Sequence, residues 1–230
     1  MPASGSESAY DPVLRWLIFT GVSVFAAVAL WRYGLTRLML ASDRTHISSV
    51  IAALYLVASL HACACAVAIS RVAAATEALH ARRRLPPGLV GDYIGELKTK
   101  AAARGAGPLD QTLLLRALSQ RLRAGHALGA LASDALMKLG LVGTIVGFVL
   151  MLAPVAGLDA TDDAAVQTAM ARMSEGMAVA MYTTLAGLVG SILLKLQYYM
   201  LDSATSGLFS RVVRLTETRV VPALERRYDR

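Results

Sequence analysis

Four apolar blocks in this sequence are close to or above the roughly 20 residues with which a helix crosses a bilayer. They cover residues 13–30, 47–69, 135–158 and 176–194. Apolar residues make up 56% of the chain and charged residues only 17%, and a soluble core does not require apolar residues to be gathered in blocks. The sequence therefore predicts an all-α integral membrane protein with four transmembrane helices. The part outside lipid is too small for a large catalytic domain.

The last two blocks carry stripes of small residues within otherwise apolar helices. Residues 139–147 read LGLVGTIVG, and residues 176–191 read GMAVAMYTTLAGLVGS. At helical spacing the small and polar side chains gather on one face of each block, which lets two helices approach closely in lipid. Those expected to pack the helices or line a pore are Gly140, Gly143, Gly147, Gly176, Ala180, Gly187 and Ser191, with Thr144, Thr183 and Thr184 among them. From the residues alone, two interpretations stay open: a helix-packing core whose threonines bond to their own backbone, or a polar ion path.

The position of the charges predicts the topology. Eleven Lys and Arg residues lie in the stretch from residue 70 to 138 and seven from Lys195 onward, whereas the loop between the last two blocks is acidic. The positive-inside rule then places residues 70–134 and the C-terminus in the cytoplasm, and the acidic loop outside. The first hairpin, taken alone, favours the opposite orientation because Arg32, Arg37 and Arg44 lie in its turn.

Other possible functions find little support. The arginines flank apolar blocks without interleaved aromatics, so we expect no nucleic-acid partner. Cys63 and Cys65 lack the further ligands that a metal site needs, and with His61 they fit packing or hydrogen bonding inside a helix bundle. There is no Ser/His/Asp set, zinc spacing or phosphate loop, so we expect no enzyme, no catalytic residue, no metal and no cofactor. The N-terminal arm has no basic region of the kind that begins a signal peptide.

Four regions follow from these patterns. We expect an N-terminal arm and first hairpin at 1–69, a cytoplasmic helical region at 70–134, a pore hairpin at 135–196 and a cytoplasmic C-terminal helix at 197–230. Asp110 is the expected cap of a helix that runs on toward the third block, and Pro154 is expected to kink or end that block. Helical periodicity from 176 to 221 predicts one helix about 70 Å long. Gln197, Tyr198 and Tyr199 are expected to form an interfacial belt.

The two stripes closely resemble the MotA/TolQ/ExbB proton-channel family, over residues 134–206. The segments LGLVGTIVGF and TTLAGLVGS carry the resemblance, in their sequence and in their spacing. It implies a homopentamer in the bacterial inner membrane around two copies of a single-span MotB/TolR/ExbD-like partner, whose intramembrane aspartate carries the ion. It also implies that Thr144 and Thr184 correspond to the two pore-facing threonines of the family. Thr183 stands where TolQ and ExbB usually have alanine.

The sequence departs from the family pattern at two places. Val179 stands where ExbB has a glutamate, and Glu175 lies one turn further out. Glu175 is either a substitute entrance group for the ion or a cap at the outer end of its helix. Met137 and Lys138 stand where flagellar MotA has a proline, which weighs against a flagellar stator, although four spans are more like MotA than the three of ExbB.

Together these features predict an ion-channel subunit of a rotary stator or energy-transducing motor, with a proton as the expected ion. The ion pathway would contain Thr144, Thr183, Thr184 and Glu175. The blocks contain no acidic residue, so the proton-carrying step would need the partner. The alternative is a pentameric scaffold that conducts nothing and only anchors and orients a partner. A solute transporter is disfavoured because no inverted repeat is visible.

Overall fold

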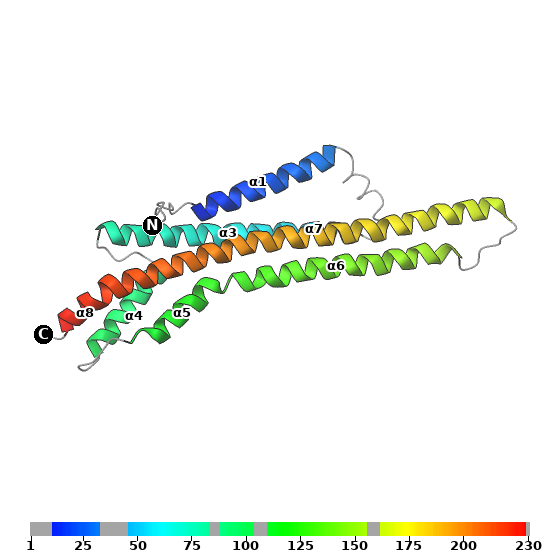
Figure 1. Ribbon diagram of the computed structural model, residues 1–230. Helices are drawn as coiled ribbons and strands as arrows, with labels where there is room; N and C mark the ends of the chain where they lie inside the picture. Colours follow the sequence, from blue (N-terminus) through cyan, green and yellow to red (C-terminus); the bar gives the residue numbers. More distant parts are fainter. Residues whose placement is uncertain (1–10, 33–45, 83–87, 104–109, 156–161, 229–230) are drawn as a thin grey trace, which may run out of the picture. The chain divides into compact units, whose positions relative to one another are not determined.

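The computed structural model describes residues 11–32, 46–82, 88–103, 110–155 and 162–228, and all elements in these ranges are helical. The helices in Figure 1 are α1 (Asp11–Arg32), α3 (Ile47–Arg82), α4 (Leu89–Ala103), α5 (Thr112–Arg123), α6 (His126–Leu152), the 3₁₀ turn η1 (Ala153–Val155), α7 (Asp163–Leu215), the π-turn η2 (Thr216–Val220) and α8 (Val221–Tyr228). The predicted all-α class is thus confirmed for this part of the chain.

Three of the described helical stretches are long and apolar enough to cross a membrane. They are Ile47–Ala74, Thr112–Val155 and Asp163–Arg226, and they contain the described parts of the second, third and fourth predicted blocks. Within α1 the apolar stretch is shorter, Trp16–Phe25. The expected orientation of the first hairpin depends partly on Arg37 and Arg44. Both lie outside the described residues.

The contacts divide the chain into two compact units. Unit 1 contains Met1–Leu17, Ala62–Ala127 and Tyr199–Arg230, and unit 2 contains Ile18–His61 and Leu128–Tyr198. Helices α3 and α7 each contribute residues to both units.

In unit 2, α6 and α7 lie side by side in opposite directions (Figure 1). Leu136 of α6 meets Gly187 of α7, whereas Gly147, further along α6, meets Gly176, earlier in α7. At Gly187, Gly147 and Gly176 the missing side chains permit contact with the backbone of the other helix.

In unit 1, α4, α5 and α8 surround a small apolar core. Leu97 and Ala101 of α4 pack with Val221 and Leu224 of α8, and Leu114 of α5 lies against them. All four of the buried residues are less than 9% exposed, so this cluster attaches the C-terminal helix to α4.

The ends of the helices follow local chemistry. Asp162 Oδ1 accepts a hydrogen bond from the Ala164 backbone N–H at 3.0 Å, which caps the start of α7. Asp110 Oδ1 accepts from Thr112 N at 2.9 Å, but the N-cap position of α5 is Gln111, one residue after the predicted cap. Pro154 lies in η1, directly after α6.

Two predicted helix boundaries are wrong. The helix expected from 176 begins earlier, at Asp163, and its α-helical hydrogen bonding gives way to the π-turn η2 at Thr216. The helix expected to continue from Asp110 into the third block is interrupted between α5 and α6, beside Gly125. Glycine weakens a helix through its backbone entropy, by about 0.5–1 kcal/mol.

Candidate functional site

Glycines let α6 and α7 approach each other backbone to backbone. A Cβ added to Gly187 would lie 2.7 Å from the Leu136 carbonyl oxygen and 2.8 Å from the Gly140 Cα. Side chains do not approach backbone atoms so closely, so any larger residue at 187 would push the two helices apart.

A second approach lies further along the same pair. A Cβ on Gly147 would lie 2.6 Å from the Ala180 backbone nitrogen, and one on Gly176 would lie 2.8 Å from the Gly147 carbonyl oxygen. The residues that meet at the two approaches are called the glycine seam below. They are Gly140, Gly143 and Gly147 of α6 with Gly176, Ala180 and Gly187 of α7.

Thr183 lies inside the glycine seam. Its side chain is 0% exposed and packs against Gly143, where a Cβ would collide with the threonine side chain. Its Oγ1 donates to the Val179 carbonyl oxygen at 2.8 Å, with the Ala180 carbonyl at 3.2 Å, so the hydroxyl is satisfied by its own helix. Within one chain, Thr183 therefore fills the space that Gly143 leaves. Ser191 is also buried on α7, at 2% exposure.

Thr184 joins the two helices. Its Oγ1 lies 3.2 Å from the Gly140 carbonyl oxygen on α6 and 3.1 Å from the Ala180 carbonyl oxygen on its own helix. A hydroxyl has one proton and two lone pairs. Thr184 shares its proton between these two carbonyls, and its lone pairs can still accept a hydrogen bond. Its side chain is only half-buried, which leaves that capacity within reach of a further group.

Thr144 is half-buried on α6, and its Oγ1 donates to the Leu141 carbonyl oxygen at 2.5 Å. This bond stays within α6, so the lone pairs of the Thr144 hydroxyl likewise remain as acceptors. Both threonines thus combine a satisfied donor with a partly exposed acceptor.

Glu175 is exposed on α7. The interpretation that it caps the outer end of its helix is wrong, because α7 begins at Asp163 and its first turn contains Asp163 instead. The N-terminal partial charge of a helix falls off within its first turn, so Glu175 is beyond its reach. Asp159, at the predicted outer entrance, lies outside the described residues.

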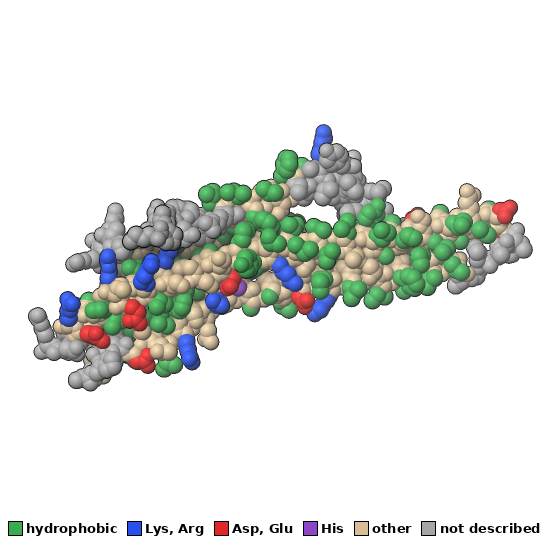
Figure 2. Space-filling model, in the orientation of Figure 1, with side chains coloured by type: hydrophobic (Ala, Val, Ile, Leu, Met, Phe, Trp, Pro, Cys, Tyr) green, Lys and Arg blue, Asp and Glu red, His purple; other side chains and the backbone are tan. Residues whose placement is uncertain are grey.

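The outward faces of the same helices are apolar. Large side chains on α6 and α7 are more than half exposed, among them Leu141 (62%), Phe148 (56%) and Met181 (66%), and Figure 2 shows hydrophobic side chains over both helices. Apolar surface of this extent marks contact with lipid or with other protein chains.

A buried polar cluster in unit 2 was not predicted. Tyr198 donates its OH to the Ala58 carbonyl at 3.2 Å, lies 2.9 Å from His61 Nδ1 and stacks on the His61 ring, which confirms that His61 hydrogen-bonds within the bundle. Gln197 is 0% exposed, with Nε2 3.4 Å from Thr20 Oγ1 and 3.5 Å from Tyr55 OH.

The predicted interfacial belt is therefore wrong for two of its three members, since only Tyr199 is exposed. The sequence holds one signal for the buried cluster, which is Gly129. A Cβ at 129 would run into the Tyr198 ring, so the glycine makes room for that aromatic side chain.

Residues 111–213 match the model of the MotA/TolQ/ExbB proton channel family. No curated protein and no solved structure matches the chain. The matched residues contain all of α6 and the whole glycine seam. With three helices among the described residues long and apolar enough to span a membrane, the chain is a multi-pass membrane protein. The residues that match the family model include Thr144, Thr183 and Thr184.

Proposed function

We propose that this chain is the ion-channel subunit of a motor that couples ion-motive force to mechanical work through a single-span MotB/TolR/ExbD-like partner. The observation that carries the proposal is Thr184, a half-buried hydroxyl on the glycine seam within a region that matches a proton-channel family. In the proposed motor, five copies of the chain surround two copies of the partner, in the bacterial inner membrane.

The hydrogen bonds support a separate role for each threonine in the proposed channel. Thr184 and Thr144 accept hydrogen bonds from a protonated carboxyl group or an ordered water on the partner, because their own protons are already donated to backbone carbonyls. Thr183 holds α6 and α7 at the spacing that presents Thr184. The glycines, Ala180 and Ser191 pack the helices that line the pore.

A partner carboxylate explains how the ion is carried. The apolar blocks of this chain contain no acidic residue, so it has no titrating carboxylate of its own at mid-membrane. Protonating the partner's carboxylate removes a charge that is costly in lipid and permits a step of the pentamer. Each proton that crosses supplies about 2.3 kcal/mol per 100 mV of membrane potential.

The proposed topology has α1 as a fourth span and the C-terminus in the cytoplasm. The basic residues of 70–138 and of the C-terminal stretch support this orientation through the positive-inside rule. Glu175 then lies on the outer side and serves as the entrance group for the ion, a role that its exposure on α7 permits.

The test is proton flux in liposomes that contain the chain together with its partner. Thr184→Val keeps the shape of the side chain and removes the hydroxyl, so we expect flux to fall about tenfold, as for the loss of one hydrogen bond of about 1.4 kcal/mol. Complex assembly should persist, because an interhelical hydrogen bond in a membrane contributes only about 0.6 kcal/mol. Thr168→Val is the matched control, since Thr168 is an exposed threonine of α7 that bonds only to its own helix.

A non-conducting scaffold is the second candidate, and one observation favours it. The hydroxyls of Thr144, Thr183 and Thr184 all donate to backbone carbonyls of α6 or α7, as they would in a purely structural seam. Flux that is unchanged in Thr184→Val would support the scaffold. Flux through the chain alone, at the rate of the complex, would contradict a partner-carried ion.

A further inference from the structure

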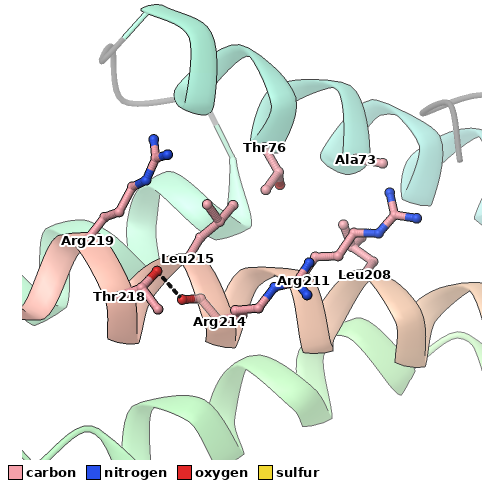
Figure 3. Close-up of a pocket in the computed structure, with 8 residues that line it drawn as sticks. All are labelled: Ala73, Thr76, Leu208, Arg211, Arg214, Leu215, Thr218 and Arg219. Carbon is pink, nitrogen blue, oxygen red and sulfur yellow. Dashed lines mark hydrogen bonds between the residues drawn. The ribbon is translucent and has the colours of Figure 1, made fainter. Parts of the chain in front are cut away.

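A second site lies in unit 1, between the end of α3 and the end of α7. A pocket of about 330 Å³ opens there, at the lower end of the range for ligand sites. Figure 3 shows Ala73 and Thr76 of α3 on one side and residues of α7 and η2 on the other. The second wall consists of Leu208, Arg211, Arg214, Leu215, Thr218 and Arg219.

The lining of the pocket has an apolar part and a cationic part. Ala73, Leu208 and Leu215 supply the apolar part, and three arginines along one wall supply guanidinium groups (Figure 3). No acidic side chain is among the described residues that line it. A guanidinium presents paired N–H donors in a planar fork that matches a phosphate, so this wall suits a phosphate rather than a neutral ligand.

On α3, the pocket lies at the end of the apolar stretch. Ala73 is within the candidate span Ile47–Ala74, one residue from its end, and Thr76 is just beyond it. At such a boundary a helix passes from acyl chains to headgroups, and basic pockets between helices at this level bind anionic headgroups. An anionic phospholipid satisfies both surfaces, because its phosphate faces the arginines and its glycerol and acyl part faces the leucines.

We propose that this pocket binds the phosphate of an anionic phospholipid headgroup, held by Arg214 and Arg219. The inference goes beyond the proposed motor function, because the pocket shares no residue with the glycine seam. Its failure therefore leaves the Thr184 experiment unaffected. A soluble phosphate and an acidic peptide are competing occupants, which the experiment distinguishes.

The experiment is native mass spectrometry of the full-length protein, purified in detergent and mixed with phosphatidylglycerol or phosphatidylcholine. We expect phosphatidylglycerol to remain bound and phosphatidylcholine to be lost. Arg214→Gln with Arg219→Gln should lower phosphatidylglycerol retention about tenfold or more, since hydrogen bonds to charged groups are lost. Arg116→Gln with Arg226→Gln removes the same charge from exposed positions outside the pocket and should retain the lipid as wild type does.

Two further variants guard against misfolding. Arg214→Lys with Arg219→Lys keeps the charge without the planar fork and should give retention between the wild type and the glutamine variant. Ala73→Phe fills the pocket without changing any charge and should also lower retention. The thermal unfolding midpoint without added lipid shows whether each variant is folded.

Three results would overturn the proposed site or its proposed occupant. Equal retention of phosphatidylglycerol by wild type and by a folded glutamine variant would overturn the site. Displacement of the lipid by millimolar inorganic phosphate would overturn the lipid as occupant in favour of a soluble phosphate. Displacement by a poly-glutamate peptide, with no preference for phosphatidylglycerol over phosphatidylcholine, would overturn it in favour of an acidic peptide.

Discussion

The Tyr93 hydroxyl begins a chain of polar side chains that links three elements of unit 1. It donates to Gln111 Oε1 at 2.7 Å, and Gln111 Nε2 in turn donates to the Glu217 carboxylate. Tyr93 and Gln111 are 3% and 5% exposed, so each needs the partner that it has. A buried network in which every member is satisfied fixes how α4, the start of α5 and η2 meet.

This network predicts an alkaline loss of stability. The pKa of Tyr93 is raised from its usual 10.0 to about 12, chiefly by burial, with a hydrogen bond to Thr216 that lowers it and the Glu217 charge that raises it as smaller effects. The neutral form is thus favoured in the folded state, and the stabilisation is present below pH 10 and lost as the pH rises from 10 toward 12. Its size is about 2–3 kcal/mol.

Thermal unfolding in detergent between pH 8 and pH 11.5 checks this prediction. The midpoint of wild type should fall more steeply above pH 10 than that of Tyr93→Phe, which has no hydroxyl to ionise. Tyr199→Phe, at a 75% exposed position, should follow wild type. Parallel curves for wild type and Tyr93→Phe would contradict the assignment.

At the scale of whole elements, α6 and α7 contact each other backbone to backbone along the glycine seam. Helices in lipid gain little from hiding apolar surface, so close backbone contact is their main source of attraction. The seam should consequently be sensitive to a single methyl group at some positions and indifferent to it at others.

Two glycines only three residues apart test this. In Gly187→Ala the new methyl group would lie 2.7 Å from a backbone oxygen, and we expect a loss of about 1–3 kcal/mol, as for other overpacked contacts. In Gly190→Ala its nearest neighbour would be the Leu136 Cδ1 at 3.7 Å, an ordinary contact. That variant should be neutral or more stable by up to about 1 kcal/mol. Free energies of unfolding in mixed micelles give the comparison, and equal values would show that the seam is not tightly packed.

The predictable part of these elements is the part with a strong periodic signal. Glycine and threonine spacing indicated the faces on which α6 and α7 meet, because in lipid small residues have few other uses. The start of α7 is not predicted because the acids at 159, 162, 163 and 175 indicate a loop, although the stretch 164–173 between them is rich in Ala and Met, which favour a helix, and Asp162 caps it. Gln197 and Tyr198 escaped because amphipathic side chains beside a span fit an interfacial belt as well as a buried cluster.

For the whole molecule, the exposed apolar faces of α6 and α7 must be covered by lipid or by protein. Lipid can cover such faces, but the half-buried threonines at the seam would then face lipid as well, which is costly for polar groups. Further copies of the chain and a polar partner helix would cover both kinds of surface. The number of chains in the complex can be inferred from the sequence only through the family resemblance, because a stripe of small residues gives no information on that number.

Native mass spectrometry in detergent tests the assembly. We expect five copies of the 24.3 kDa chain in each complex. Met181→Glu puts a charge on a 66% exposed face and should yield smaller species, whereas Thr168→Glu, at an exposed position outside the seam, should not. A monomer as the main species of wild type under mild conditions would contradict the pentamer.

The π-turn η2 changes which side chains are buried and which are exposed after the end of α7. Buried positions recur along α7 at Leu201, Thr205, Leu208 and Val212. They continue at Thr216 of η2, and the next ones are Val221 and Leu224 of α8. An unbroken α-helix would continue this series near Arg219, and so would turn its guanidinium toward the buried side. Because η2 contains one residue more than an α-turn needs, the phase of the helix slips, and Arg219 is exposed beside the pocket while Leu224 joins the α4 core. Deleting Thr218 would remove the extra residue, so that Val221 and Leu224 would continue the buried series of α7 in one unbroken α-helix.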